Sequence, residues 1–252
     1  MSSATSIDEV LVGLDSILAE TTARRSRLAL FPALYRLVTA RVQQGIRDGR
    51  FADGPRMERL DAVFAGRYLD AFAGFKLGAP VTKSWRVAFH AAADPGLITL
   101  QHLLLGMNAH INLDLGIAAA TICPGPAIDG LRADFDTIND VLGELLGGVQ
   151  AALNETSPML ASLDRFCGGA DESFAGFAIG KARKQAWRVA SVLATLPPEH
   201  HPMAIALLDQ QTATLGRLIT RPDPTTRAAL ALIRLRESDD IPAITAALLR
   251  AA

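Results

Sequence analysis

Apolar residues recur at helical spacing along almost the whole chain. Ser6 and Glu9 have the spacing of a capping box, and apolar side chains then follow three or four positions apart up to Leu18. The same pattern, bounded by Pro, Gly, Asp or Thr, predicts further helices at 32–49, 53–77, from 82, and at 97–123, 128–153, 158–166, 171–196, 198–218, 224–236 and 241–249. No segment alternates convincingly with a period of two. The pattern therefore predicts an all-α fold.

Length and composition are those of one globular unit. The chain has 252 residues, half of them hydrophobic, and no linker rich in Ser, Gly or Pro divides it. We therefore expect a single helical domain over residues 1–252. Its predicted form is a compact multi-helix bundle around a buried central helix at about 97–123.

The net charge and the N-terminal sequence indicate which partners the protein lacks and where in the cell it is located. The formal net charge is -1, whereas nucleic-acid binders usually concentrate Lys and Arg on one face, so we expect no nucleic-acid partner. The first 20 residues lack the basic region and apolar block of a signal peptide, which favours a cytoplasmic location. Segment 97–123 is long enough to cross a bilayer, but its polar centre would be costly in lipid, so we expect no membrane span.

Segment 97–123 is apolar overall but carries five polar side chains near its middle. These are His102, Asn108, His110, Asn112 and Asp114. A polar group moved into an apolar interior without a partner costs roughly 2–7 kcal/mol, and an unpaired carboxylate costs far more. These side chains must therefore meet protein partners, water, a metal or a ligand.

The spacing of these residues suggests two kinds of chemistry. His110 and Asp114 occupy neighbouring positions on one helix face, and Asn108 and Asn112 share another. Because H-x-x-x-D is a common helical ligand spacing, His102, His110 and Asp114 are candidate ligands for one divalent ion, Zn, Fe or Mn. Without a metal, Asp114 can orient His110 for acid–base catalysis. Asn112 is then a further catalytic candidate, and Asn108 a substrate-binding one.

Three residues outside the central segment are candidates for substrate binding. Arg183 and Trp187 share a helix face, where an arginine can bind an anion and an indole can form the wall of a pocket. Asn139 lies in a polar stretch early in the helix predicted at 128–153. Asp61 and Arg67 also add charge to an apolar helix, and the simpler interpretation of Arg67 is a surface group.

These residues also carry a resemblance to a known family. QHLLLGMNAHINLDL resembles the signature of an uncharacterised bacterial, actinobacterial-type domain-of-unknown-function family, with the core His-x5-Asn-Ala-His-Ile-Asn-x-Asp-Leu. The resemblance extends over most of the chain, including FPALYRLVTARV, ADFDTIN and ARKQAW. It implies an all-helical fold and a shared polar centre, and it brings no reaction with it.

Three hypotheses of function follow for this centre. The first is a metal-dependent, hydrolase-like enzyme acting on a small molecule. The second is a metal-free acid–base lyase, isomerase or cyclase, and the third is a non-catalytic helical protein that binds a small ligand. No Walker loop, Rossmann fingerprint, G-x-S-x-G or H-E-x-x-H motif is present, which disfavours nucleotide and serine-hydrolase chemistry. The oligomeric state stays open.

Overall fold

The computed structural model describes residues 4–160 and 173–251, and within this part every regular element is helical. The all-α prediction is therefore confirmed. The first half contains α1 (Ile7–Ala23), η1 (Arg27–Ala29), α2 (Leu30–Arg47), α3 (Gly54–Lys76), α4 (Lys83–Ala91), α5 (Thr99–Ala109), η2 (His110–Leu115) and α6 (Gly116–Ile122). The second half contains α7 (Ala127–Thr156), α9 (Ser173–Thr195), η3 (Pro198–His200), α10 (His201–Thr220), α11 (Pro224–Arg234) and α12 (Ile241–Leu249). Most of the helix predicted at 158–166 lies outside the described residues.

Local sequence signals set several helix starts. The Ser6 side chain caps α1 by accepting a hydrogen bond from the backbone of Glu9, as the capping-box spacing predicts. The Glu9 carboxylate accepts further hydrogen bonds from the backbone and side chain of Thr5. Pro32 lies in the first turn of α2, where its missing N–H costs nothing. Asp53 caps α3 by accepting from the backbone of Arg56.

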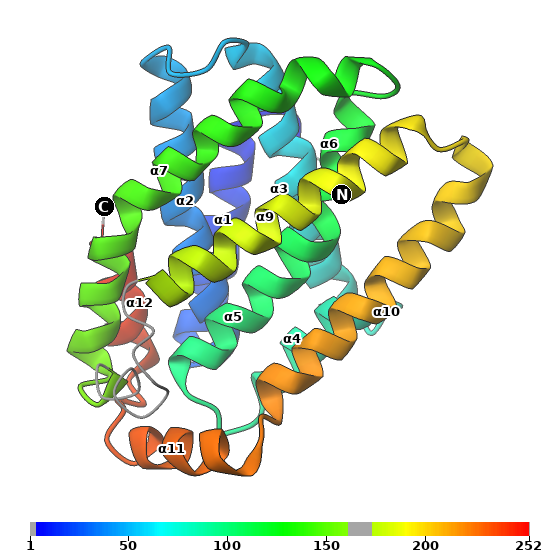
Figure 1. The fold of residues 1–252 in the computed structure, drawn as a ribbon. Coiled ribbons are helices and arrows are strands. Elements are labelled where there is room, and N and C mark those ends of the chain that lie inside the picture. Colours follow the sequence, from blue (N-terminus) through cyan, green and yellow to red (C-terminus); the bar gives the residue numbers. More distant parts are fainter. Residues whose placement is uncertain (1–3, 161–172, 252) are drawn as a thin grey trace.

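The central helix is continuous from Thr99 to Ile122 but changes its winding in the middle. Its η2 segment is π-helical, so the turns around His110 and Asp114 are wider than those of α5 and α6. The helix contacts α2, α3, α4, α9 and α10, and Figure 1 shows α5 in the middle of the bundle with α10 beside it. This helix is long and apolar enough to cross a membrane, yet 78% of its apolar 18-residue window is buried inside the protein. It is thus packed as a core helix.

Two glycines let other helices approach the central helix closely. A Cβ at Gly106 would lie 2.3 Å from the Phe31 ring of α2. A Cβ at Gly116 would lie 2.9 Å from the carbonyl oxygen of Ala186 on α9. Real Cβ atoms do not approach other heavy atoms this closely, so both positions require glycine at the present helix spacing. The first contact brings Phe31 beside the polar centre of the helix.

The C-terminal helix α12 completes the core at one end of the bundle. It packs against α2 and α7, and Figure 1 shows it beside both. Ile244 and Leu248 of α12 are buried in one apolar cluster with Leu34 and Leu153. Burial of such side chains is the main stabilising contribution of an amphipathic helix.

Candidate functional site

Asp114 is the centre of a buried polar network in η2. Its side chain is 1% exposed. One carboxylate oxygen accepts a 2.7 Å hydrogen bond from Arg67 Nε on α3, and the other accepts a 2.8 Å bond from Trp85 Nε1 on α4. His110 Nδ1, four residues earlier, lies 3.4 Å from the oxygen that Trp85 contacts. Two neighbouring helices therefore fix the carboxylate, and the carboxylate orients the imidazole ring.

The His110 ring is enclosed by aromatic side chains. It stacks on Phe64, with ring centroids 3.6 Å apart, and meets Tyr35 edge to face at 4.4 Å. Its Nε2 atom is buried and has no hydrogen-bond partner. Burial lowers the pKa of His110 despite the opposing effect of Asp114, so the ring is neutral at pH 7. Because the carboxylate can only accept, we assign the proton to Nδ1 and a free lone pair to Nε2.

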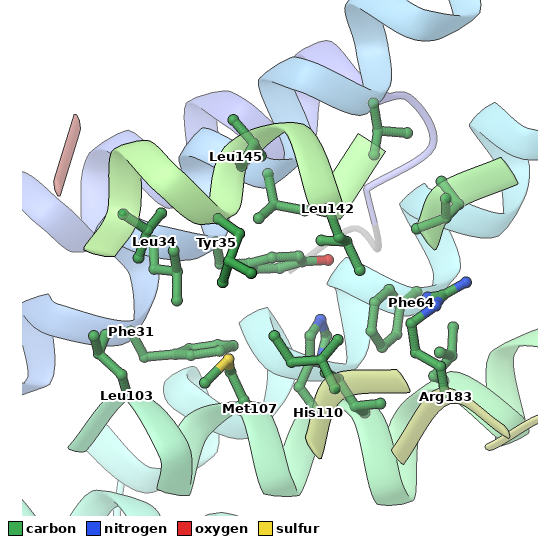
Figure 2. A pocket seen from close by; sticks show the side chains of 18 of the residues that line it. Phe31, Leu34, Tyr35, Phe64, Leu103, Met107, His110, Leu142, Leu145 and Arg183 are labelled. Atoms are coloured by element: carbon green, nitrogen blue, oxygen red, sulfur yellow. The ribbon is translucent and has the colours of Figure 1, made fainter. Parts of the chain in front are cut away.

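His110 forms part of the wall of a cavity of about 240 Å³. The cavity lies between the central helix and helices α2, α3, α7 and α9, and Figure 2 shows His110 between Met107 and Phe64 below Tyr35. An apolar cavity of about 150 Å³ in another protein is large enough to bind benzene. The apolar lining includes Phe31, Leu34, Phe64, Leu103, Met107, Leu142, Leu145 and Leu153. The cavity thus has the size and lining for an apolar small molecule.

Few polar side chains of the described residues reach this cavity. Those among its lining residues are Tyr35, Asp61, His110, Gln150 and Arg183. The Tyr35 hydroxyl and one Asp61 oxygen are buried without a hydrogen-bond partner, as is His110 Nε2. Burial, with a smaller effect of Glu58, raises the pKa of Asp61 to about 7. Burial also raises the pKa of Tyr35, so its hydroxyl remains protonated at neutral pH.

Arg183 brings a positive charge to the same wall. It is a residue of α9, and its Nε donates a 2.6 Å hydrogen bond to the side-chain oxygen of Asn139 on α7. Its Nη2 donates to the backbone carbonyl of Phe135. Burial lowers the pKa of Arg183 to about 10, so the guanidinium is still charged at pH 7. Asn139 therefore holds Arg183 and is not itself a lining residue.

The two asparagines of the central helix have a separate set of contacts. Asn108 donates a 2.9 Å hydrogen bond to the backbone carbonyl of Thr212 on α10. Asn112 donates a 3.0 Å bond to the side-chain oxygen of Asn108. Neither residue lines the cavity. Their contacts fix the position of α10 against the central helix and do not place them beside His110 Nε2.

His102 lies apart from the His110–Asp114 pair. It lines a second, much smaller pocket with Arg27, Trp85 and Phe89, and burial lowers its pKa to about 4. Both Asp114 oxygens already accept hydrogen bonds from Arg67 and Trp85. Among the described residues, no group of three or more His, Cys, Asp or Glu side chains could hold a metal ion. The three predicted metal ligands therefore do not form a donor set here.

The remaining candidates illustrate what sequence spacing misses. Trp187 packs against Phe135, with ring centroids 5.0 Å apart, and is not among the residues that line the cavity. Arg67, interpreted as a surface group, instead forms an ion pair with Asp114. Nothing in the sequence distinguishes Tyr35 and Phe64, because aromatic residues at helical spacing usually indicate only core. For Asp61 and Arg67 the available signal was a charge inside an apolar helix pattern.

Comparison with curated proteins and with solved structures found no match to this chain. A family model does match it over residues 7–222, which include η2 and all helices that line the cavity. The chain therefore belongs to a family of unknown function, DUF5995.

Proposed function

We propose that this protein is a metal-free enzyme that binds a largely apolar small molecule in the central cavity and uses His110 as a general base. The observation that carries the proposal is His110 Nε2, an unpartnered nitrogen of a neutral, oriented imidazole in the wall of an apolar cavity. A base of this kind can remove a proton from a carbon or hydroxyl of a bound substrate. Many lyase, isomerase and cyclase reactions begin with such a step.

The network behind His110 supports a role beyond packing. Asp114 is held by Arg67 and Trp85 and can stabilise the imidazolium that forms when Nε2 takes up a proton. The π-helical winding of η2 also supports a functional role, because such segments occur frequently at functional sites. Nε2 is covered in this structure, so the proposal includes a small movement of the surrounding aromatic rings when substrate enters.

The proposal is tested with a generic proton-abstraction probe, 5-nitrobenzisoxazole. Removal of its C3 proton by a base breaks the ring N–O bond and forms a nitrile and a phenolate, which absorbs visible light. We expect the wild-type protein to catalyse this reaction and His110→Gln to lose about tenfold or more, since a positioned base contributes about 10²–10⁴ for a well-placed substrate. The wild-type rate should level off above the lowered pKa of His110 and fall in acid.

His102→Gln is the matched control, because His102 is also a buried histidine with an unpartnered Nε2 but lines a different pocket. Its rate should equal that of the wild type. Equal rates for the wild type and His110→Gln, with both proteins folded by circular dichroism, would contradict the role of His110 as a base.

The second candidate function is non-catalytic binding of an apolar ligand, which the mostly apolar lining favours. An apolar compound that co-purifies unchanged with the wild type, in a protein inactive towards the probe, would support it. The metal-dependent alternative predicts about one equivalent of Zn, Fe or Mn by mass spectrometry, lost in His110→Gln. We also infer that the pattern from His102 to Leu115 is a signature of the family, because it contains the base and its orienting carboxylate.

A further inference from the structure

Arg183 is a buried positive charge without an ionic partner among the described residues. Arg183 is only 5% exposed. No carboxylate among the described residues forms an ion pair with its guanidinium. Within the described part of the chain it contacts an amide oxygen, a backbone carbonyl and the ring of Phe135, whose centroid lies 4.4 Å from the guanidinium carbon. The acidic residue that acts on it electrostatically is Asp136, which is half exposed and forms its own ion pair with Arg132 at 2.7 Å.

Other buried acidic residues in the described part of the chain are in ion pairs, are protonated or, like Asp209, accept hydrogen bonds from backbone N–H groups. Asp114 pairs with Arg67, and Asp134 pairs with Arg56 at 2.7 Å. Asp61 avoids a buried charge by keeping its proton up to about pH 7. The Arg183 guanidinium cannot become neutral in the same way, because its pKa of about 10 leaves it charged at pH 7. An uncompensated buried charge is expensive, so a bound anion would remove a real cost.

The guanidinium has capacity for that anion. Arginine carries five N–H groups, of which the bonds to Asn139 and Phe135 use two, leaving three without an acceptor among the described residues. Arg183 is also the only Lys or Arg among the described residues that line the cavity. One fixed positive charge matches one negative charge, and a planar guanidinium matches the two oxygens of a carboxylate.

The shape of the cavity indicates what is attached to the carboxylate. On the central helix its lining extends from Leu100 to Leu115, a distance of about 20 Å at the helical rise per residue. Lining residues spread over such a length indicate an elongated space. Figure 2 shows Arg183 at one end, Leu103 and Leu34 towards the other, and His110 between them.

We propose that the cavity binds an aliphatic monocarboxylate, with the carboxylate on Arg183 and the alkyl chain along the apolar wall past His110. This inference rests on the proposed function and names its substrate class. The carboxylate accepts from the free N–H groups of Arg183, and Asn139 and Phe135 hold the guanidinium in place. The chain replaces empty volume between the leucine side chains of α2, α5 and α7.

The test is calorimetric titration of the purified protein, freed of lipid on a hydrophobic resin, with decanoate and with decan-1-ol at pH 6, where decanoate is ionised and Asp61 still holds its proton. The two compounds share a chain length and differ in charge. We expect decanoate to bind wild-type protein about tenfold or more tightly than decan-1-ol, the range for hydrogen bonds to a charged group. Arg183→Met should reduce decanoate binding to the level of decan-1-ol and leave decan-1-ol binding unchanged.

Arg132→Met is the matched control, because Arg132 is a half-exposed arginine that packs over Trp187 and does not line the cavity. It should keep the decanoate preference. Should Arg183→Met fail to fold, the wild-type ratio decides the question together with Arg183→Lys, which keeps the charge, loses the planar fork and should show an intermediate preference.

The outcomes separate this inference from the proposed function. Equal affinity of the wild type for the two compounds, or undiminished decanoate binding by folded Arg183→Met, would overturn the carboxylate assignment while leaving the cavity as a ligand site. Binding of neither compound would overturn both the carboxylate assignment and the cavity as the site of function.

Discussion

At the scale of single residues, Asp61 connects the cavity to the stability of the protein. Its carboxyl lies in the cavity wall, and one oxygen has no hydrogen-bond partner. Burial raises its pKa from 3.8 to about 7, so the folded protein holds a proton that the unfolded chain has lost at intermediate pH. Folding therefore binds this proton, and the free energy of unfolding contributed by Asp61 falls as the pH rises from about 4 to about 7.

We predict that Asp61→Asn removes this pH dependence. Relative to the variant, the wild type should lose about 1.4 kcal/mol of unfolding free energy per pH unit within that window. This loss of unfolding free energy relative to Asp61→Asn should be smallest near pH 4, grow up to about pH 7 and then stay constant. Urea unfolding of both proteins at pH 4, 5, 6, 7 and 8 measures it.

Two buried histidines do not disturb this comparison. The lowered pKa values of His102 and His110 make both proteins less stable as the pH falls below 6.5, and this effect cancels in the difference. Parallel pH profiles for the wild type and Asp61→Asn would show that the Asp61 carboxyl titrates normally in the folded protein.

Residue-scale predictions from the sequence were accurate only within one helix. The spacing of His110 and Asp114 predicted their proximity, because four residues on one helix fix the distance between side chains. Arg67, Trp85 and Tyr35 reach this pair from three other helices. Hydrophobic periodicity defines which face of each helix is buried, but it does not define the rotation or register of one helix against another.

At the scale of elements, the close contact between α6 and α9 depends on Gly116. A Cβ there would meet Ala186 O at 2.9 Å and Val189 Cγ1 at 2.7 Å. We predict that Gly116→Ala destabilises the protein by about 1–3 kcal/mol, because a backbone oxygen cannot move aside as a flexible side chain can. Thermal and urea unfolding measure the change.

Gly143 on α7 gives the matched comparison. It is exposed and has no atom within 4 Å of an added Cβ, so Gly143→Ala should stabilise by about 0.5–1 kcal/mol through helix propensity alone. A stabilising effect of Gly116→Ala would mean that α6 and α9 are not packed as closely as the structure places them.

Sequence patterns predicted most elements but not the winding of the central one. Caps and prolines mark helix ends locally, so the starts of α1, α2 and α3 followed from a few neighbouring residues. Segment 97–123 was predicted as one uninterrupted helix, whereas η2 within it is π-helical. Such a segment has one extra residue in a turn, and its winding depends on tertiary contacts. The residue types in HINLDL do not predict it.

At the scale of the whole molecule, the family match ends at residue 222, but the core continues beyond it. Leu248 of α12 is 1% exposed and shares an apolar cluster with Leu34 and Leu153, two residues that also line the cavity. The last helix therefore supports the end of the cavity opposite Arg183. Its contribution should appear both in global stability and in the binding of apolar ligands.

We predict that Leu248→Ala lowers the free energy of unfolding by about 2–5 kcal/mol, the usual cost of a cavity left by a buried leucine. Leu249 is its neighbour in sequence and is 36% exposed, so Leu249→Ala should change stability by less than about 0.5 kcal/mol. Urea unfolding compares the two variants, and titration with decan-1-ol should show weaker binding for Leu248→Ala alone. Equal effects of the two substitutions would place α12 outside the core and leave the cavity to be closed by the helices within the family match.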